Sequence, residues 1–485
     1  MISISFLNFF DIFDDFFRNF AFFMPKSPVF SYFIYMEGIL FFNNYRNIHF
    51  IGVGGVSMSG LAKFCLTQGV NVSGSDKTLT NELKRLSSLG AKIYIGHKGK
   101  NAENADLVVY SSAIAPNNPE KVYAVRHGIP ILKRSEFLGR ILSAFRRTVA
   151  VAGSHGKTTT TAMIAEALIA ANFDPTVFLG GERKTFGNFR SGGGEFAVAE
   201  ACEYKRNFLD IKPDVAVVLN IDNDHVDTYK DMNDETEAFS RFCKNGLAVI
   251  NADDVYACRI YNSSTVTFGI KNLAAYSAKY IDKKEMRSFT AYAYGKRLGR
   301  ITLALSGLHN VYNALAAIAV LNELRVPFKV VKSSIAAFDG VKRRNEYIGA
   351  FDGVKCVADY AHHPTEIKAL LSDKAEKTLA VFQPHTYSRT AALLGEFASA
   401  LKEADGVIIY KTYPAREKFS YCGDGKRLFE EISKSYAGDI CYAGGSHALY
   451  KALKKRAKEY EKILFIGAGD VYSVAKEITG SKKGF

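Results

Sequence analysis

The sequence lacks the features that would place this protein outside the cell or within a membrane. Its seven cysteines are scattered without a C-x-x-C pair, so neither a disulfide framework nor a zinc site of paired cysteines is expected. No uninterrupted apolar run is long enough for a membrane span, and no clear secretory signal is present. These absences favour a cytoplasmic protein without stable membrane insertion.

Low-complexity segments and nucleic-acid signatures are also missing. The chain has 48% hydrophobic and 13% aromatic residues, which is typical of globular proteins, and its 485 residues suggest two to four domains. Acidic residues are fewer than basic ones, 49 against 63, so the formal net charge is +14. This charge favours anionic partners, but no basic stripe with interleaved aromatics is present. Nucleotide phosphates are therefore expected as ligands, and nucleic acid is not.

Residues 1–45 form a phenylalanine-rich leader that contains F-F-D-I-F-D-D-F-F-R-N-F. Asp11, Asp14 and Asp15 interrupt it too often for a spanning helix. Two interpretations stay open: an amphipathic surface helix, and a start codon assigned too far upstream, with Met36 as the alternative start. No function is assigned to this segment.

The chain is organised around residues 148–161, T-V-A-V-A-G-S-H-G-K-T-T-T-T. A short β-branched run precedes two glycines and good helix formers follow, which predicts a strand, a phosphate-binding loop and a helix. Loop amides and the helix N-terminus would face an anion, while Lys157 adds charge at the outer phosphates. A nucleoside triphosphate is the predicted ligand, although Val151 stands where the full motif has glycine. The expected contacts here are Gly153, Ser154, His155, Gly156, Lys157, Thr158 and Thr159.

A second glycine-rich turn lies near the N-terminus, where an apolar strand over 48–51 runs into G-V-G-G-V-S-M-S-G and a helix from about Ser57. A dinucleotide fingerprint needs glycine at Ser57, so an NAD site remains only an alternative. Asp76 ends the next strand, where a carboxylate commonly meets a ribose hydroxyl. Further strands are expected over 91–95, 107–110 and 129–132, and their alternation with helical stretches predicts a parallel sheet.

Two strands after the phosphate loop end in metal-binding groups. Residues 196–199 lead into Glu200, and residues 215–219 lead into a segment with His225. Parallel strands converge on the edge where the phosphate loop lies, so both side chains are expected near the phosphates. A carboxylate, an imidazole and the Thr158 hydroxyl suit Mg²⁺ that keeps several waters. A capping or core role for His225 is the alternative.

The C-terminal part again alternates strands and helices, with strands expected over residues 355–358, 379–382, 407–410 and 463–466. The loops after them carry a cationic rim suited to an amino-acid carboxylate and a phosphorylated intermediate; it consists of His362, His363, His385, Arg389 and Arg416. Any one of these histidines could also be an ordinary loop residue. Arg343 and Arg344 point different ways in most backbones, so one is expected at a phosphate and the other in a structural contact.

In this order the motifs resemble the Mur ligases, the ATP-dependent enzymes that build the peptide of bacterial cell-wall precursors. The resemblance runs from about Ile48 to Gly469 and includes I-H-F-I-G-V-G-G-V-S-M-S-G-L-A, S-G-S-D, S-S-A-I, H-H-P-T-E and F-Q-P-H-T-Y-S-R-T. It implies an α/β protein of three domains. These are a Rossmann-like UDP-binding domain (46–146), a central P-loop ATPase-type domain with a mostly parallel sheet (147–342), and a Rossmann-like C-terminal domain that binds the amino acid and closes (343–485).

The resemblance also implies residue roles. The UDP-sugar contacts would be Gly54, Gly55, Ser57, Met58, Asp76, His97 and Ser112. The ATP base and ribose would meet His309, Asn310 and Asn313, which without the resemblance could be the cap of a core helix over 306–320. Arg344 would reach a phosphate, and the metal ligands would be Thr158, Glu200 and His225. The catalytic set would be Lys157, His363, His385 and Arg389.

The implied reaction is ATP- and Mg²⁺-dependent joining of L-alanine to the lactyl carboxylate of UDP-N-acetylmuramate, by a monomer or homodimer. A ligase that attaches a recycled tripeptide to the same sugar nucleotide is the nearest alternative. An NAD-dependent oxidoreductase and a non-catalytic nucleotide-binding regulator are the others. The sequence departs from the family pattern at Cys202, Tyr204, Asn345 and Ala358. The first two stand in E-A-C-E-Y, where the commoner form is E-A-D-E-S.

Overall fold

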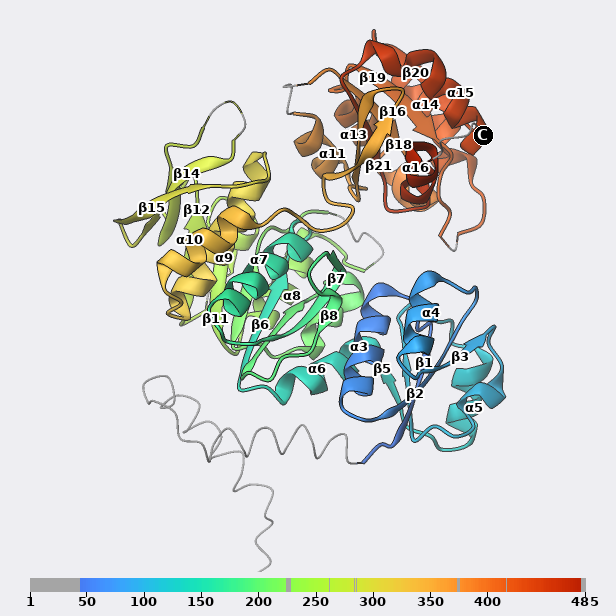
Figure 1. The fold of residues 1–485 in the computed structure, drawn as a ribbon, viewed down its shortest axis with the longest axis vertical. Coiled ribbons are helices and arrows are strands. Elements are labelled where there is room, and N and C mark those ends of the chain that lie inside the picture. Colours follow the sequence, from blue (N-terminus) through green and yellow to red (C-terminus); the bar gives the residue numbers. More distant parts are fainter. Residues whose placement is uncertain are drawn as a thin grey trace, which may run out of the picture.

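The computed structural model describes residues 44–480 except 224–227, 261, 283, 285, 373–375 and 416. The phenylalanine-rich leader through residue 43, His225 and Arg416 therefore lie outside the described residues. The rest of the chain forms three α/β units, each built around its own sheet (Figure 1). Within these ranges no helix combines the length and the apolar character needed to cross a membrane.

The first unit holds a five-stranded sheet in the order β3-β2-β1-β4-β5, and every neighbouring pair is parallel, as predicted. Its strands are β1 (Asn47–Ile51), β2 (Asn71–Asp76), β3 (Lys92–Ile95), β4 (Leu107–Tyr110) and β5 (Ile131–Lys133). Its helices are α3 (Val56–Thr67), α4 (Asn81–Ser88), α5 (Pro119–Arg126) and α6 (Arg134–Ser143). The strand order reverses beside β1, and in such sheets ligands bind in the crevice at that point.

The central unit holds a ten-stranded sheet in the order β15-β14-β13-β12-β11-β10-β6-β9-β7-β8. Strands β6 to β13 run parallel in their pairs except for the β7–β8 hairpin, and β14 and β15 are antiparallel. The strands are β6 (Arg147–Ala152), β7 (Thr176–Arg183), β8 (Gly187–Arg190), β9 (Phe196–Glu200), β10 (Val215–Val218), β11 (Leu247–Asn251), β12 (Thr265–Gly269), β13 (Tyr276–Lys279), β14 (Ser288–Ala293) and β15 (Lys296–Thr302). The helices are α7 (Lys157–Ala170), α8 (Met232–Phe242), α9 (Leu308–Glu323) and α10 (Phe328–Ala337). Helices α7 and α9 are apolar on most sides because they pack against each other and the sheet.

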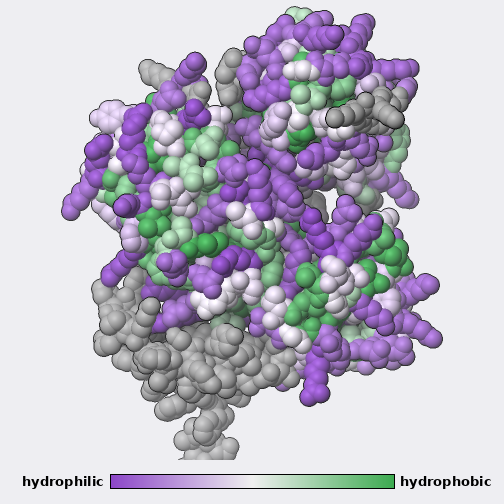
Figure 2. All heavy atoms as spheres, in the orientation of Figure 1, coloured by the Kyte–Doolittle hydropathy of each residue, from purple (hydrophilic) through white to green (hydrophobic). Residues whose placement is uncertain are grey.

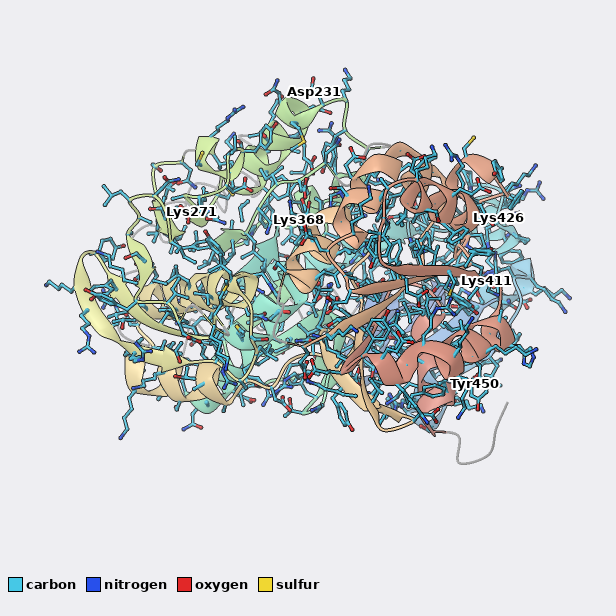
Figure 3. The ribbon with its side chains drawn as sticks, turned by 90° about the horizontal axis from the view of Figure 1, so that it is seen from above. Asp231, Lys271, Lys368, Lys411, Lys426 and Tyr450 are labelled. Carbon is cyan, nitrogen blue, oxygen red and sulfur yellow. The ribbon has the colours of Figure 1, made fainter. Side chains whose placement is uncertain are left out.

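The C-terminal unit holds six strands in the order β16-β17-β21-β18-β19-β20, of which only β16 and β17 pair antiparallel. The strands are β16 (Glu346–Phe351), β17 (Val354–Asp359), β18 (Thr378–Phe382), β19 (Gly406–Tyr410), β20 (Asp439–Ala443) and β21 (Lys462–Ile466). The helices are α11 (Pro364–Leu371), α12 (Tyr387–Ala392), α13 (Leu394–Leu401), α14 (Gly425–Ser433), α15 (Ser446–Arg456) and α16 (Val471–Gly480). Seen from above, this unit covers the N-terminal one, and α11 with Lys368 lies at its border with the central unit (Figure 3).

Helix α3 joins the first unit to the second by packing on the β7–β8 hairpin (Figure 1). Lys63 Nζ donates to Asn188 Oδ1 at 2.7 Å, and Asn188 Nδ2 donates to the Val56 carbonyl at 2.6 Å. The ring of Phe64 lies 5.7 Å from that of Phe178, centre to centre. Buried polar and aromatic contacts of this kind fix how the two units face each other.

Candidate active site between the three domains

A cavity of about 1310 Å³ opens where the three units meet. Hydrophilic side chains surround the opening between the N-terminal and C-terminal units (Figure 2). All the residues predicted to contact the UDP-sugar line this cavity: Gly54, Gly55, Ser57, Met58, Asp76, His97 and Ser112. The central unit adds Ser154, Gly156, Lys157, Thr158 and Glu200, and the C-terminal unit adds Arg344, Tyr360, His362 and Glu366. Residues that were predicted to bind ligands, and that come from all three units of the chain, thus line the same cavity.

The phosphate loop has the backbone that its glycines allow. Gly153 has φ +133° and Gly156 has φ +86°, conformations that side chains other than glycine rarely adopt. Helix α7 begins directly after Gly156, and a Cβ on this glycine would lie 2.4 Å from Asn313 Oδ1. Glycine therefore lets the loop pass close to α9, and it leaves the first amides of α7 available to an anion.

Lys157 lies folded over this loop. Its Nζ donates to the carbonyl oxygens of Gly153 and Ser154, the latter at 3.0 Å, and lies 3.0 Å from Glu203 Oε1. Burial opposes the charge, but Glu203, Cys202 and Glu200 together outweigh burial and raise the pKa of Lys157. Glu203, whose side chain is 1% exposed, positions the ammonium group of Lys157. No role was predicted for this residue from the sequence. Its position inside E-A-C-E-Y was the only signal for it.

Two of the three predicted metal ligands are adjacent. Thr158 Oγ1 donates to Glu200 Oε2 at 3.1 Å, and the Gly180 amide donates to Glu200 Oε1 at 2.5 Å. Burial raises the pKa of Glu200, so a cation beside it would stabilise the ionised form. A carboxylate and a hydroxyl at a phosphate loop fit Mg²⁺. The third predicted ligand, His225, lies outside the described residues.

The glycine turn after β1 is shaped by Asp76. The Gly54 amide donates to Asp76 Oδ2 at 2.9 Å, and a Cβ on Gly54 would lie 2.8 Å from that oxygen. Arg134 Nη1 donates to Ser57 Oγ at 3.0 Å, which places a cation beside the predicted pyrophosphate contact. The Asp76 carboxylate therefore binds the turn itself as well as facing the cavity.

A buried carboxylate holds the predicted nucleotide contact His97. Glu120 has no exposed surface; its Oε2 lies 2.9 Å from His97 Nδ1 and 2.7 Å from Ser75 Oγ, and its Oε1 accepts from Asn101 Nδ2 at 2.5 Å. Burial alone would raise the pKa of Glu120, but hydrogen bonds from His49, Ser75, Asn101 and His97 lower it below its usual 4.5. No pattern in the sequence had indicated this role for Glu120.

Glu120→Gln is expected to reduce the local stability of the first sheet by about 2 kcal/mol, because hydrogen bonds to a charged buried group are lost. The folded-state pKa is below the ordinary value, so this stabilisation is present above about pH 4.5 and disappears as the pH falls further. Hydrogen exchange of the β1 and β2 amides at several pH values measures it. Glu103→Gln, an exposed carboxylate of the same unit, is the control. Equal effects of both variants would contradict the assignment.

The predicted contacts to the ATP base lie at the start of α9, behind the phosphate loop. Its N-cap is Gly307, without a side-chain cap, so His309 is not the cap and lies exposed in the first turn. Asn310 Nδ2 donates to the Ser306 carbonyl at 2.7 Å, and Thr160 Oγ1 donates to Asn313 Oδ1 at 3.3 Å. Asn313 thereby connects α9 to α7, while His309 faces solvent.

The two consecutive arginines point to different surroundings. Arg343 Nη2 donates to the carbonyl oxygens of Gly467 and Gly469, both at 3.1 Å, which is a structural contact. Arg344 lines the cavity, and its Nη1 lies 3.6 Å from Glu366 Oε1. Arg344 is thus the member of the pair that can reach a phosphate.

His385 and Arg389 form a pair beside the cavity, with Arg389 Nη1 3.4 Å from His385 Nδ1. The His385 ring lies 5.8 Å from that of the cavity-lining His362 and stacks on Tyr413 at 5.6 Å. His363 is buried elsewhere, with its ring centre 5.3 Å from that of His155 in the phosphate loop. The predicted cationic rim is therefore split. His385 and Arg389 lie next to each other beside the cavity, whereas His363 packs against the central unit.

The structure shows the surroundings of two positions that depart from the family pattern, Cys202 and Ala358. Burial raises the pKa of Cys202, so a neutral thiol lines the cavity where the commoner form has an acid. Asp359, the neighbour of Ala358, is buried, and burial raises its pKa to about 6. Its carboxylate accepts from the amides of Asn345 and Ala361 at 2.7 and 2.8 Å, so it shapes the turn after β17.

Comparison with known proteins follows the same three-part division. Family models match residues 47–146 (Mur ligase family, catalytic domain), 151–321 (Mur ligase middle domain) and 343–469 (Mur ligase, glutamate ligase domain). The UDP-N-acetylmuramate–L-alanine ligase of Clostridium novyi (strain NT) is 40% identical over 453 residues, covering 91% of this chain and 98% of the relative. This chain belongs to the Mur ligase family. The predicted family and the predicted α/β fold of three units are thereby confirmed.

Other Mur ligases extend the match. The UDP-N-acetylmuramate–L-alanine ligase of Aquifex aeolicus (strain VF5) is 41% identical over 446 residues, covering 89% of this chain and 97% of the relative. The crystal structure of the UDP-N-acetylmuramate–alanine ligase of Thermotoga maritima superimposes with a TM-score of 0.77 at 30% identity, covering 90% and 98% of the two chains. A murein peptide ligase from Psychrobacter arcticus has a TM-score of 0.69 at 23% identity, covering 91% and 100%, a likeness of fold alone.

Proposed function

We propose that this Mur ligase joins L-alanine to the lactyl carboxylate of UDP-N-acetylmuramate at the expense of ATP, as the names of its relatives indicate. The main support for this proposal is the single cavity that is lined by the phosphate loop, Glu200 and all the predicted UDP-sugar residues. A carboxylate is a poor electrophile because expelling oxide is prohibitive. Transfer of the γ-phosphoryl group of ATP to it forms an acyl phosphate and ADP. The alanine amine then attacks the acyl carbon, the C–O bond to phosphate breaks, and the amine loses a proton.

The roles proposed for the residues follow from charge. Lys157 and the amides of the phosphate loop stabilise the transferring phosphoryl group, which lowers the repulsion between two anions. Thr158 and Glu200 are proposed to hold Mg²⁺, whose charge would further screen the phosphates. Arg344 projects into the same cavity from the C-terminal unit and is placed to contact a phosphate oxygen.

His385 and Arg389 are proposed to bind the carboxylate of L-alanine. They form a polar pair next to the cavity, and guanidinium groups bind carboxylates in a forked geometry. Because reactants lie on different units, closure of the C-terminal unit would assemble the site and keep water from the acyl phosphate.

Phosphate release tests the proposal. With ATP and Mg²⁺ present, release is expected to require both UDP-N-acetylmuramate and an amine substrate, and L-alanine is expected to exceed glycine, L-serine and the recycled tripeptide assayed in parallel. The tripeptide arm separates the nearest alternative activity. Release that needs neither sugar nucleotide nor amine, or a preference for the tripeptide, would overturn the proposed reaction.

A further inference from the structure

In the phosphate loop, His155 contacts the C-terminal unit. Its Nε2 lies 3.0 Å from Asp222 Oδ2, beyond the end of β10, and its Nδ1 lies 3.3 Å from Glu366 Oε1 in the first turn of α11. His363, just before α11, completes the group, because its Nδ1 lies 3.4 Å from Asp222 Oδ2. Two nitrogen atoms and one carboxylate oxygen, contributed by two domains, lie within 4.8 Å of one another.

We propose that His155, Asp222 and His363 form a binding site for Zn²⁺ or a similar transition-metal ion that bridges the central and C-terminal domains. Neighbouring ligand atoms of a tetrahedral zinc site lie about 3.3 Å apart, since zinc–nitrogen and zinc–oxygen bonds are roughly 2.0–2.1 Å long. The distances from Asp222 Oδ2 to His155 Nε2 and to His363 Nδ1 are 3.0 and 3.4 Å and bracket that value. Three protein ligands leave one of the four tetrahedral positions for water or an anion.

The ligand set distinguishes this site from that of Mg²⁺. Imidazole nitrogens favour zinc, copper, nickel and iron, whereas magnesium prefers oxygen ligands. The nearby predicted magnesium ligands Thr158 and Glu200 offer oxygen only. The two sites therefore select different ions.

The surroundings also have the form that supports zinc-bound histidine. Histidines that bind zinc commonly donate their second N–H to a carboxylate, which orients the ring. The Glu366 carboxylate is such a partner for His155, since it lies next to the second ring nitrogen, Nδ1. The Asp222 carboxylate is oriented in turn by Thr365 Oγ1, which donates to Asp222 Oδ2 at 2.7 Å. His363 Nδ1 accepts a long hydrogen bond of 3.4 Å from the Thr365 amide at the start of α11, and a zinc ion on this nitrogen would replace that weak bond.

Metal binding here has a mechanical consequence. Zinc would bind the neutral imidazole of His155, so a proton held on its Nε2 would pass to solvent. The ion would then join the phosphate loop to the start of α11 by coordinate bonds. Because the domains must separate to exchange substrates and products, zinc is expected to slow turnover by holding them together.

Calorimetric titration of the chelator-treated full-length protein with zinc chloride, without nucleotide, tests the site. One zinc per chain is expected. Affinity should fall at least tenfold in Asp222→Asn and in His363→Ala, and about tenfold in Glu366→Gln, which removes only the orienting carboxylate. His447→Ala, an exposed histidine of the same domain, and the double variant Cys258→Ser/Cys422→Ser, which removes two exposed thiols, should bind zinc as the parent does.

Hydrogen exchange tests separately whether the metal ion bridges the central and C-terminal domains. Zinc should slow hydrogen exchange of the α11 amides in the parent and not in Asp222→Asn, while α15 serves as the internal reference. Absence of zinc binding, or unchanged affinity in both Asp222→Asn and His363→Ala, would overturn the site. Binding without protection of α11 would overturn the bridge. These results are independent of the ligase assay, so failure here leaves the proposed reaction intact.

Discussion

Lys157→Ala is expected to abolish phosphate release while UDP-N-acetylmuramate still binds. The ammonium group lies over the phosphate loop, and its loss removes the charge proposed to stabilise the transferring phosphoryl group. A fall in kcat of at least about 10³-fold is expected. The predicted UDP-sugar contacts lie on another domain, so the dissociation constant of the sugar nucleotide should change little, as titration calorimetry would measure.

A control is needed because Lys157→Ala leaves the Glu203 carboxylate buried without its cation, which destabilises proteins. The double variant Lys157→Met/Glu203→Gln removes both charges and should be equally inactive but more stable. Lys184→Ala removes an exposed lysine of the same domain and should retain activity. Near-normal phosphate release by Lys157→Ala would count decisively against the proposed mechanism.

Glu200→Gln is expected to lower turnover by roughly 10²- to 10³-fold by removing one charge from the proposed magnesium site. The amide oxygen can still accept from Gly180, so the local fold should be kept. Binding of Mn²⁺, followed by electron paramagnetic resonance as a stand-in for Mg²⁺, should weaken in parallel. This second readout separates loss of the ion from loss of catalysis.

Glu195→Gln is the matched control, because this half-exposed carboxylate lies just before the same strand β9 and pairs with Arg146. It should bind Mn²⁺ and turn over like the parent. If Glu200→Gln bound Mn²⁺ as tightly as the parent, the carboxylate would not be a metal ligand.

Much of the site was predictable because its groups follow parallel strands. Glu200 ends β9, Asp76 ends β2, and the phosphate loop follows β6, so sequence-local patterns placed each of them at a sheet edge. The glycines of the phosphate loop were equally informative, since positive φ angles at Gly153 and Gly156 require that residue. These features depend on a few adjacent residues.

Other parts depended on contacts between distant segments. Glu203 binds a lysine 46 residues away, and Glu120 meets Ser75 across 45 residues. The strands β7, β8, β11 to β16 and β20 were not predicted. Four of them, β8, β15, β16 and β20, lie at sheet edges, and edge strands have weak periodicity and form when a neighbouring strand supplies hydrogen bonds. No local pattern marks such partners.

The sequence by itself determined the alternation of strands and helices, the phosphate loop and the chemical groups available at each sheet edge, because backbone preferences and strand ends are properties of short segments. The division into three units came from the resemblance to the Mur ligases. Only the tertiary structure decided which groups share a space. It packed α3 on the β7–β8 hairpin, decided that Arg344 and not Arg343 lines the cavity, and placed His155 against α11. Those choices follow from how apolar faces of whole domains bury one another, which no short stretch of sequence contains.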